Sequence, residues 1–457
     1  MTRNADEAPH AGPTRRATSA LTLLIIIAAS IHGARVLSAR PVYVVNDQSR
    51  WSTIRALVDT GTYAIGTRYG RRYDGTYRDV GIVSERGWRT VDQVLHPTTR
   101  RFYSSKPTLL PTLLAGEYWL IKQTVGWHIT RDRAKVARTI LLTINWLPFV
   151  WSLCLLARLL ERHARTDWAR IFVMCAAGFG TFVGTFLISL NNHTVAAAGA
   201  LFTIYHVLRI ELEGRREGWR FAAAGVFAGW TACNELPAAS FAAAILLWLW
   251  TTSWRRTLSV AVPCAALPVM AYLGTQYLAV GDIVPSYGRP EWYHYGGGYW
   301  NHPVGIDAVR EPKPVYAFHL LVGHTGILSL TPLFLLGWIG MVRWSIHPDG
   351  DQVERRAKRW LGGLTLVVTV VVFLFYVYRT HNYGGVTSAP RWFFWLTPLW
   401  LITMIGEADR WASSRWRRRT AMFVLAISVA SATMTLANPW QPSWYLSLLR
   451  HLNLIAY

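Results

Sequence analysis

Three side chains that can do chemistry lie within one helical turn of each other, in the stretch VVNDQSRWSTIRALVDTG at residues 44–61. Asp47 offers a carboxylate that can accept a proton, Arg50 a cation that can hold an anion, and Trp51 a flat apolar surface. They lie directly outside an apolar segment. Helix capping is the plain alternative, because Asp47 can accept backbone N–H bonds at a helix start and Gly61 permits the backbone that ends a helix.

Four further polar residues lie at or near the ends of apolar segments: Lys106, His193, Glu235 and Arg391. His193 belongs to a short NNH connection, for which a polar turn is the ordinary explanation. Glu235 is either a functional carboxylate at membrane level or a helix cap. Arg391 either faces an anion or anchors its helix at the membrane interface. We treat all four as candidate substrate-binding residues.

For other residues that could take part in chemistry, the sequence pattern favours a structural role. His319 and His324 lie near the end of one apolar segment without an acidic partner at metal-binding spacing. Asp92 is a candidate second acid, although an exposed strand position is its more ordinary explanation. The four cysteines each lie in an apolar run and form no CxxC pair, which is typical of core residues. We expect no cofactor, and the pattern leaves a divalent metal open.

The composition indicates a polytopic membrane protein. Of the 457 residues, 52% are hydrophobic and only 16% are charged, which is unlike an ordinary soluble globule. A net charge of +22 is also found in nucleic-acid binders, but here the basic residues flank apolar runs. We therefore expect membrane lipids as neighbours and no nucleic-acid partner.

The hydropathy pattern predicts an all-α polytopic membrane protein with about eleven transmembrane helices in a single membrane domain over residues 1–457. The apolar segments are 18–38, 138–157, 170–190, 194–212, 219–233, 237–252, 257–278, 319–342, 361–379, 391–406 and 419–437. Pro237 interrupts the pair at 219–252, which forms either two short spans or a re-entrant hairpin.

Alternate connections between these segments are rich in Lys and Arg, which places them in the cytoplasm. The N-terminus is then cytoplasmic, and residues 39–137, 279–318 and 438–457 lie outside, as expected for a protein of the bacterial inner membrane. Arg15 and Arg16 resemble a twin-arginine export signal, but no small-residue cleavage site follows. We therefore expect an uncleaved first span.

The first outward loop, residues 39–137, combines several kinds of element. WSTIRALV places Trp51, Ile54 and Val58 on one helical face, as in a helix at the membrane surface. YGRRYDGTYRDVGIV and GWRTVDQV indicate short strands around glycine turns. An amphipathic apolar helix suited to the interface follows Pro107.

The outward loop 279–318 contains PSYGRPEWYHYGGGYWNHP, which is dense in aromatic residues and glycine. Aromatic rings stack on sugars and glycines allow movement, so one interpretation is a lid over a substrate. The alternative is a loop that rests on lipid headgroups, where Trp and Tyr are also enriched.

The Asp-x-x-Arg-aromatic pattern of Asp47, Arg50 and Trp51 just after the first span, followed by Lys106-Pro107 ahead of an apolar helix, resembles the C-type integral membrane glycosyltransferases. The similar branch contains the protein O-mannosyltransferases and the lipid A aminoarabinose transferase. The resemblance covers the first 160 residues; beyond them it rests on the arrangement of spans and on GVFAGWTACNELPA and NYGGVTSAPRW.

The resemblance implies a bundle of many helices whose first outward loop bears the catalytic acid, with a polyprenyl-phosphate sugar as donor. Asp47 would be the base that deprotonates an acceptor hydroxyl in an inverting single displacement, while Arg50 and Lys106 stabilise the departing phosphate. Trp51 would contact the sugar or the prenyl chain. The acceptor is a glycan, a lipid or a protein.

Two positions depart from the family pattern. Gln48 stands where a second acid is usual, which weakens any metal site because one carboxylate binds a cation poorly. Thr108 replaces the second proline after Lys106. Two other interpretations therefore stay open: a transporter with broken helices around a midplane site, and a catalytically inactive membrane scaffold.

Overall fold

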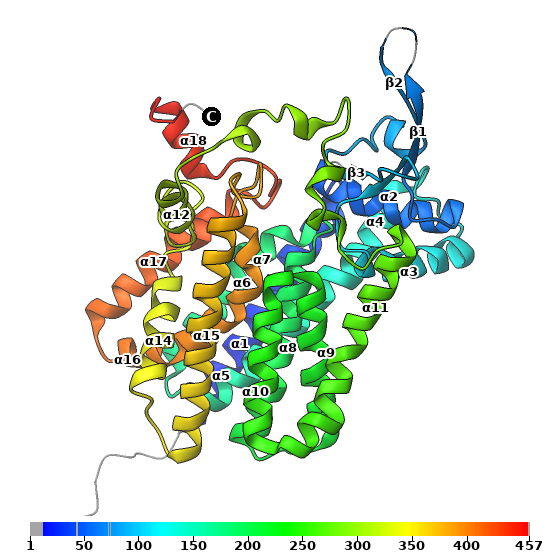
Figure 1. Cartoon of the computed structure of the whole chain (residues 1–457). Coiled ribbons are helices and arrows are strands. Elements are labelled where there is room, and N and C mark those ends of the chain that lie inside the picture. Colours follow the sequence, from blue (N-terminus) through cyan, green and yellow to red (C-terminus); the bar gives the residue numbers. More distant parts are fainter. Residues whose placement is uncertain (1–11, 43, 72, 74, 456–457) are drawn as a thin grey trace, which may run out of the picture.

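A bundle of helices carries a small β-sheet and several connecting loops at one end (Figure 1). The computed structural model describes residues 12–42, 44–71, 73 and 75–455. The bundle helices are α1 (Arg15–Ser38), α4 (Arg133–Leu141), α5 (Leu147–His163), α6 (Asp167–Phe179), α8 (Asn192–Leu212), α9 (Gly218–Asn234), α10 (Ala239–Arg256), α11 (Val262–Val280), α14 (Phe334–Ile346), α15 (Gln352–Arg379), α16 (Thr397–Ala412) and α17 (Arg415–Thr433). Short helices are α7 (Phe182–Thr185), α12 (Lys313–Leu321), α13 (Ile327–Leu330) and α18 (Trp444–His451).

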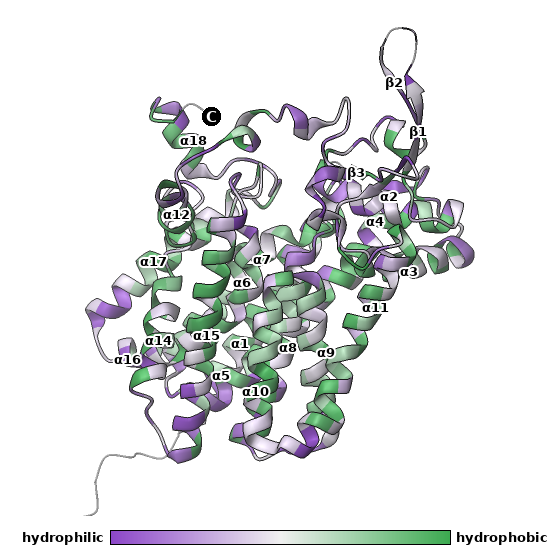
Figure 2. Ribbon diagram, in the orientation of Figure 1, coloured by the Kyte–Doolittle hydropathy of each residue, from purple (hydrophilic) through white to green (hydrophobic). Residues whose placement is uncertain are grey.

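The chain is an integral membrane protein. Six helical segments of the described chain are long and apolar enough to cross a bilayer: Arg15–Ser38, Arg133–His163, Asp167–Ile188, Asn192–Leu212, Leu236–Val280 and Gln352–Arg379. Figure 2 shows apolar residues along the middle of the bundle and polar residues towards its two ends. The number of eleven spans stays a prediction.

The two ends of the bundle differ in character. The connections 213–217, 253–257 and 347–351 lie at the lower end in Figure 1, where Arg215, Arg216, Arg255 and Arg256 gather; we call this the basic end. The sheet, α12 and α18 lie at the opposite end, which we call the site end. The positive-inside rule assigns the basic end to the cytoplasm, and this orientation stays a prediction.

The ambiguous pair at 219–252 forms two separate antiparallel helices. Helix α9 has 17 residues and α10 has 18, so at 1.5 Å per residue each is about 25–27 Å long. Glu235 and a 3₁₀ turn at Leu236–Ala238 join them at the site end. At the basic end, non-helical dihedral angles at Ser253 turn the chain towards α11.

The hydropathy predicts one continuous apolar span over 319–342, but the structure interrupts this segment twice. It contains the end of α12, all of α13 and most of α14. Gly323, Gly326 and Pro332 lie in the interruptions, because glycine lowers helix propensity and proline lacks a backbone donor. Segment 391–406 begins as a 3₁₀ helix, Arg391–Leu396, before α16.

Residues 45–125 contain two helices and a four-stranded antiparallel sheet. The helices are α2 (Val45–Thr60) and α3 (Leu109–Val125); the strands are β1 (Gly66–Arg71), β2 (Tyr77–Val80), β3 (Gln93–Leu95) and β4 (Arg101–Ser104), in the order β2-β1-β4-β3. Helix α2 packs against α3 and β4. Trp51 and Ile54 are fully buried, so this face of α2 lies in the protein core.

Two glycines let α9 approach α11 closely. A Cβ atom built on Gly225 would lie 2.2 Å from the backbone oxygen of Ala261, and one on Gly229 would lie 2.2 Å from that of Ala265. Small residues four positions apart are a common means of close helix packing in membranes. The contact matters for the site end, because α9 terminates at Asn234, next to Glu235.

Gly225→Ala is therefore expected to destabilise the bundle. The added methyl group meets backbone rather than a movable side chain, and overpacking of this kind costs about 1–3 kcal/mol. Thermal unfolding of the detergent-solubilised protein should show a lower midpoint than wild type. Gly274→Ala on α11 is the matched control, since its Cβ meets no atom within 4 Å; equal loss in both variants would contradict the packing argument.

Candidate functional site

Asp47 lies in the first turn of α2, at the positive end of the helix dipole. Its side chain is buried, with 2% of the residue exposed, and its Oδ1 atom has no hydrogen-bond partner in the part of the chain that the structure describes. Backbone hydrogen bonds from Val42 and Val44 reach the carboxylate. The helix ends at Gly61, with φ of +67°. Asp47 thus assists the helix start and still presents a free oxygen.

The protonation of Asp47 is set by opposing effects. Burial is the largest and raises the pKa to about 7, whereas the hydrogen bond from Val44 and the charge of Arg50 favour the ionised form. A carboxylate whose pKa lies near neutral pH can both lose and accept a proton under ordinary conditions. This is the property that a general base requires.

Arg50 lies one turn after Asp47 and is almost fully buried. Its guanidinium donates to the side-chain oxygen of Asn46 (3.1 Å), to the backbone oxygen of Leu190 (3.4 Å) and to the side chain of Asn192. No carboxylate of the described chain lies within 4.0 Å of it. Burial lowers the pKa of Arg50 to about 10, so the group stays charged at neutral pH.

Lys106 precedes α3, and Asp92 precedes β3. The Lys106 ammonium lies 2.8 Å from Asp92 Oδ1, while Asn46 donates to Asp92 Oδ2 at 3.0 Å. The exposed strand position expected for Asp92 is wrong: its side chain is 14% exposed, because two donors hold it inward. Burial lowers the pKa of Lys106 to about 8.

Glu235, between α9 and α10, accepts three hydrogen bonds. Asn192 donates to Oε1 at 2.7 Å, His193 contacts the same oxygen through Nδ1, and Tyr376 of α15 donates to Oε2 at 3.3 Å. Asn192 also donates to the backbone oxygen of Asn234 at 2.7 Å. Asn192 also accepts a hydrogen bond from Arg50, which joins this cluster to α2.

Arg391 completes the cluster from the segment that precedes α16. It donates to His193 Nε2 at 3.2 Å and to the backbone oxygen of Gly384 at 2.7 Å. His193 Nε2 is then an acceptor, which assigns the proton to Nδ1 and makes that atom the donor to Glu235. Arg391 also lies 4.7 Å from the ring centre of Trp440, and its Nε atom has no partner among the described residues.

The structure thus brings six of the seven sequence candidates to the site end. Direct contacts connect Arg391 to His193 and His193 to Glu235, and Asn192 links Glu235 to Arg50. Lys106 joins this cluster through Asp92 and Asn46. Asp47 lies beside Arg50 on α2. Trp51 is the exception: it is fully buried in the apolar core. The exposed apolar surface expected of Trp51 is therefore not present in this structure.

Sequence reasoning missed one member of the cluster, Asn46; it considered Asp92 as a second acid and the NNH connection that contains Asn192, but preferred a surface strand and a polar turn for them. Asn192 was detectable as part of the NNH connection, and Asn46 adjoins Asp47. The ion pair of Asp92 with Lys106 has no comparable local signal, because strands β3 and β4 lie between the two residues. Gln48, at the family's second acidic position, donates to the backbone oxygens of Val42 and Gly87, both at 3.2 Å, and so has a structural role.

No group of three or more His, Cys, Asp or Glu side chains in the described residues is arranged to hold a metal ion. His319 and His324 pack ring against ring, with centroids 4.3 Å apart. The expectation of no cofactor stays a prediction, and a divalent metal stays open.

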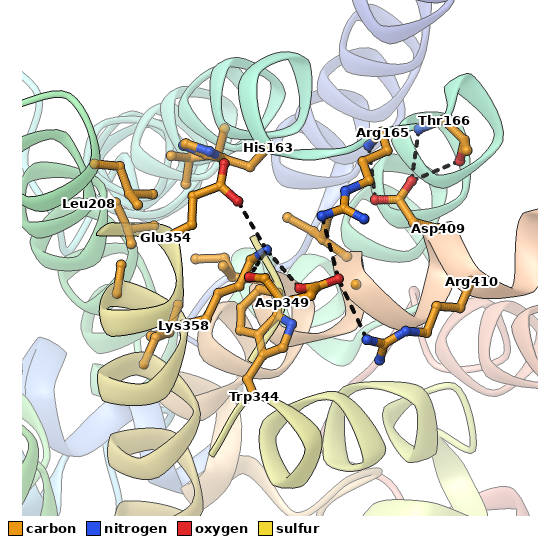
Figure 3. Close-up of a pocket in the computed structure, with 17 residues that line it drawn as sticks. His163, Arg165, Thr166, Leu208, Trp344, Asp349, Glu354, Lys358, Asp409 and Arg410 are labelled. Carbon is orange, nitrogen blue, oxygen red and sulfur yellow. Dashed lines mark hydrogen bonds and ion pairs between the residues drawn. The ribbon is translucent and has the colours of Figure 1, made fainter. Parts of the chain in front are cut away.

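A cavity of about 210 Å³ lies at the basic end and has no lining residue in common with this cluster; Figure 3 shows the side chains that line it. Asp349 lies 2.8 Å from Lys358, 3.5 Å from Arg165 and 3.6 Å from Arg410. The three cations of this cavity therefore have a carboxylate partner, whereas Arg50 and Arg391 have none within 4.0 Å in the described chain. We attribute the charges of this cavity to the packing of α5, α15 and α16.

No protein-family model matches the sequence, and no curated protein is significantly similar to it. Solved structures do match. ArnT from Cupriavidus metallidurans, bound to undecaprenyl phosphate, gives a TM-score of 0.50 at 11% identity over 91% of this chain and 76% of ArnT. The Archaeoglobus fulgidus oligosaccharyltransferase, tethered to an acceptor peptide, gives 0.50 at 12% identity over 93% and 55%.

This chain has the C-type integral membrane glycosyltransferase fold. The resemblance seen in the sequence of the first 160 residues extends, as a fold, over more than nine-tenths of the chain. At this identity the likeness concerns the fold alone.

Glu235→Gln is expected to lower the unfolding temperature. The carboxylate accepts three donors, whereas an amide presents one of them with an NH₂ group and leaves a buried donor unsatisfied, at a cost of about 1–3 kcal/mol. Thermal unfolding of the purified protein measures the loss. The exposed Glu291 is the control: Glu291→Gln should unfold as wild type does, and an unchanged midpoint for Glu235→Gln would contradict the assigned network.

Proposed function

We propose that this protein is a membrane glycosyltransferase that moves a sugar from a polyprenyl-phosphate donor to a hydroxyl group. One observation carries the proposal: Arg50 and Arg391 are buried guanidinium groups without a carboxylate partner in the described chain, beside a carboxylate with a free oxygen. A buried charge without a counter-ion is costly. The phosphate of a lipid-linked donor supplies the missing negative charge.

The structural neighbours support the choice of donor. ArnT was solved with undecaprenyl phosphate, and the archaeal oligosaccharyltransferase with an acceptor peptide. A lipid-linked donor also suits a site at the end of apolar helices, because the prenyl chain can stay in the bilayer while its phosphate reaches the polar cluster.

The proposed reaction is a single displacement at the anomeric carbon. The acceptor hydroxyl gives its proton to Asp47 as its oxygen bonds to that carbon, and the bond to the donor phosphate breaks with inversion. The phosphate leaves as an anion and needs no general acid. One base is therefore sufficient. Asp47 is the member of the described cluster that has a buried carboxylate oxygen without a hydrogen-bond partner.

Three cations have distinct relations to the leaving phosphate. Arg50 and Arg391 bond only to neutral groups, so their full charge is available as negative charge develops. Lys106 shares its charge with Asp92, which holds the ammonium in place. We propose that His193 orients Arg391 by accepting its hydrogen bond at Nε2. Glu235 selects the tautomer of His193 that allows this, because it accepts the proton on Nδ1.

The loop that follows α11 covers the sheet beside the site. Trp300 donates to the backbone oxygen of Val91 at 2.9 Å, Gln93 donates to the Tyr295 hydroxyl at 3.0 Å, and Arg68 donates to the backbone oxygen of Gly296 at 2.7 Å. The cluster beneath is buried, so substrates need an opening. We propose that this loop is the lid, on the extracytoplasmic side of the bacterial inner membrane.

Asp47→Asn is expected to lower transfer by about 10²–10⁴-fold, the usual contribution of a general base. Binding of the donor should persist, because the three cations are unchanged. The assay supplies radiolabelled polyprenyl-phosphate sugars to the purified protein and measures product and bound donor separately.

Asp59→Asn, near the other end of α2, is the matched control and should retain transfer. Equal turnover by the Asp47 and Asp59 variants would remove Asp47 as the base. Absence of transfer by the wild type with every donor tested would favour the inactive scaffold instead.

The pH dependence of kcat/KM for the donor should be bell-shaped. Asp47 must be ionised, so the rate falls tenfold per pH unit below its pKa of about 7. Lys106 must be protonated, so the rate falls again above about 8. Lys106→Arg should remove the upper limb and keep the lower one, whereas a flat profile from pH 5 to 9 would contradict both roles.

A further inference from the structure

A groove separates α10 from α15 on the outer face of the bundle, at the basic end. This open groove has a volume of about 880 Å³, and its walls include Arg355, Arg359, Trp360 and Val367 of α15 and Ala244 of α10. The groove lies at the opposite end of the bundle from Asp47 and has no residue in common with the site cluster. It therefore requires an explanation of its own.

Two arginines at the basic end of this groove have no ion-pair partner in the described chain, although the carboxylate of Asp351 also lines the groove. Arg355 and Arg359 are one helical turn apart on the same face of α15, are both exposed, and have no carboxylate within 4.0 Å in the described chain. The neighbouring Arg356 is different: it lies 3.2 Å from Glu211 and donates to the backbone oxygen of Thr251 at 2.8 Å. Arg356 thus fixes α15 against α8 and α10, while the other two arginines face the groove freely.

The rest of the groove is apolar. Trp360 lies parallel to Trp248 of α10, with ring centres 6.1 Å apart, and a Cβ on Gly363 would meet no atom within 4 Å. Val367 is 59% exposed. From Arg355 to Val367 the groove follows α15 for about 18 Å at 1.5 Å per residue. A cationic end and a long apolar wall match a charged headgroup and an acyl chain.

We propose that this groove is a binding site for an anionic phospholipid, whose phosphate lies at Arg355 and Arg359 and whose acyl chain lies along Gly363 and Val367. Basic pockets between transmembrane helices at the cytoplasmic surface select such headgroups. An anionic lipid is favoured over a zwitterionic one because the ammonium of the latter would be repelled by the two arginines.

The test compares Arg355→Gln/Arg359→Gln with Arg415→Gln/Arg419→Gln, a control pair at the same spacing on the exposed face of α17. Purified protein is titrated with phosphatidylglycerol or phosphatidylcholine, and native mass spectrometry counts the bound lipids. We expect phosphatidylglycerol to bind wild type and the control at least tenfold more tightly than the groove variant. Phosphatidylcholine should bind weakly to all three.

A second variant tests the apolar part. Gly363→Trp fills the open space and keeps both arginines. It should therefore lose the binding of phosphatidylglycerol, while its thermal unfolding midpoint stays as in the wild type. The proposal is overturned if the groove variant binds phosphatidylglycerol as wild type does, if phosphatidylcholine binds equally, or if inorganic phosphate stabilises the protein as much as the lipid. A second protein copy in place of the lipid in the spectrum would also overturn it.

Discussion

The buried guanidinium of Arg50 is the constraint around which the site end is arranged. A charged group with five donors can be buried only where several oxygens surround it. Asn46 supplies them from α2, Leu190 from the connection before α8, and Asn192 from the first turn of α8. Two segments distant in sequence, residues 46–50 and 190–192, must therefore meet at one point, and Asn192 extends the contact to Glu235.

The two ends of the bundle treat charge differently. At the basic end, Asp349 lies within 4.0 Å of three cations, so each of these cations has a carboxylate partner. At the site end, the hydrogen-bond partners of Arg50 and Arg391 among the described residues are all neutral groups. The surrounding protein is of low polarity, which strengthens every remaining electrostatic interaction. Under the proposed function, the excess of positive charge held there would bind the donor phosphate.

Several features were predictable because they depend on neighbours in sequence. Apolar runs of about 20 residues identify membrane helices, and the spacing of Asp47 and Arg50 indicates a shared helical turn. The interruption of segment 319–342 was not predicted, although Gly323, Gly326 and Pro332 are visible in the sequence. Average hydropathy hides such breaks, since an apolar loop and an apolar helix have the same mean value.

By itself, the sequence determined the membrane class, the apolar helices, and the candidates Asp47, Arg50 and Lys106 with their resemblance to a family of transferases. Only the tertiary structure decided that Trp51 is buried in the core and that Asp92 faces Lys106. The physical reason is that composition and periodicity are local properties, whereas burial and ion pairing depend on which distant segments pack together. Such contacts leave no repeat or spacing in a single chain.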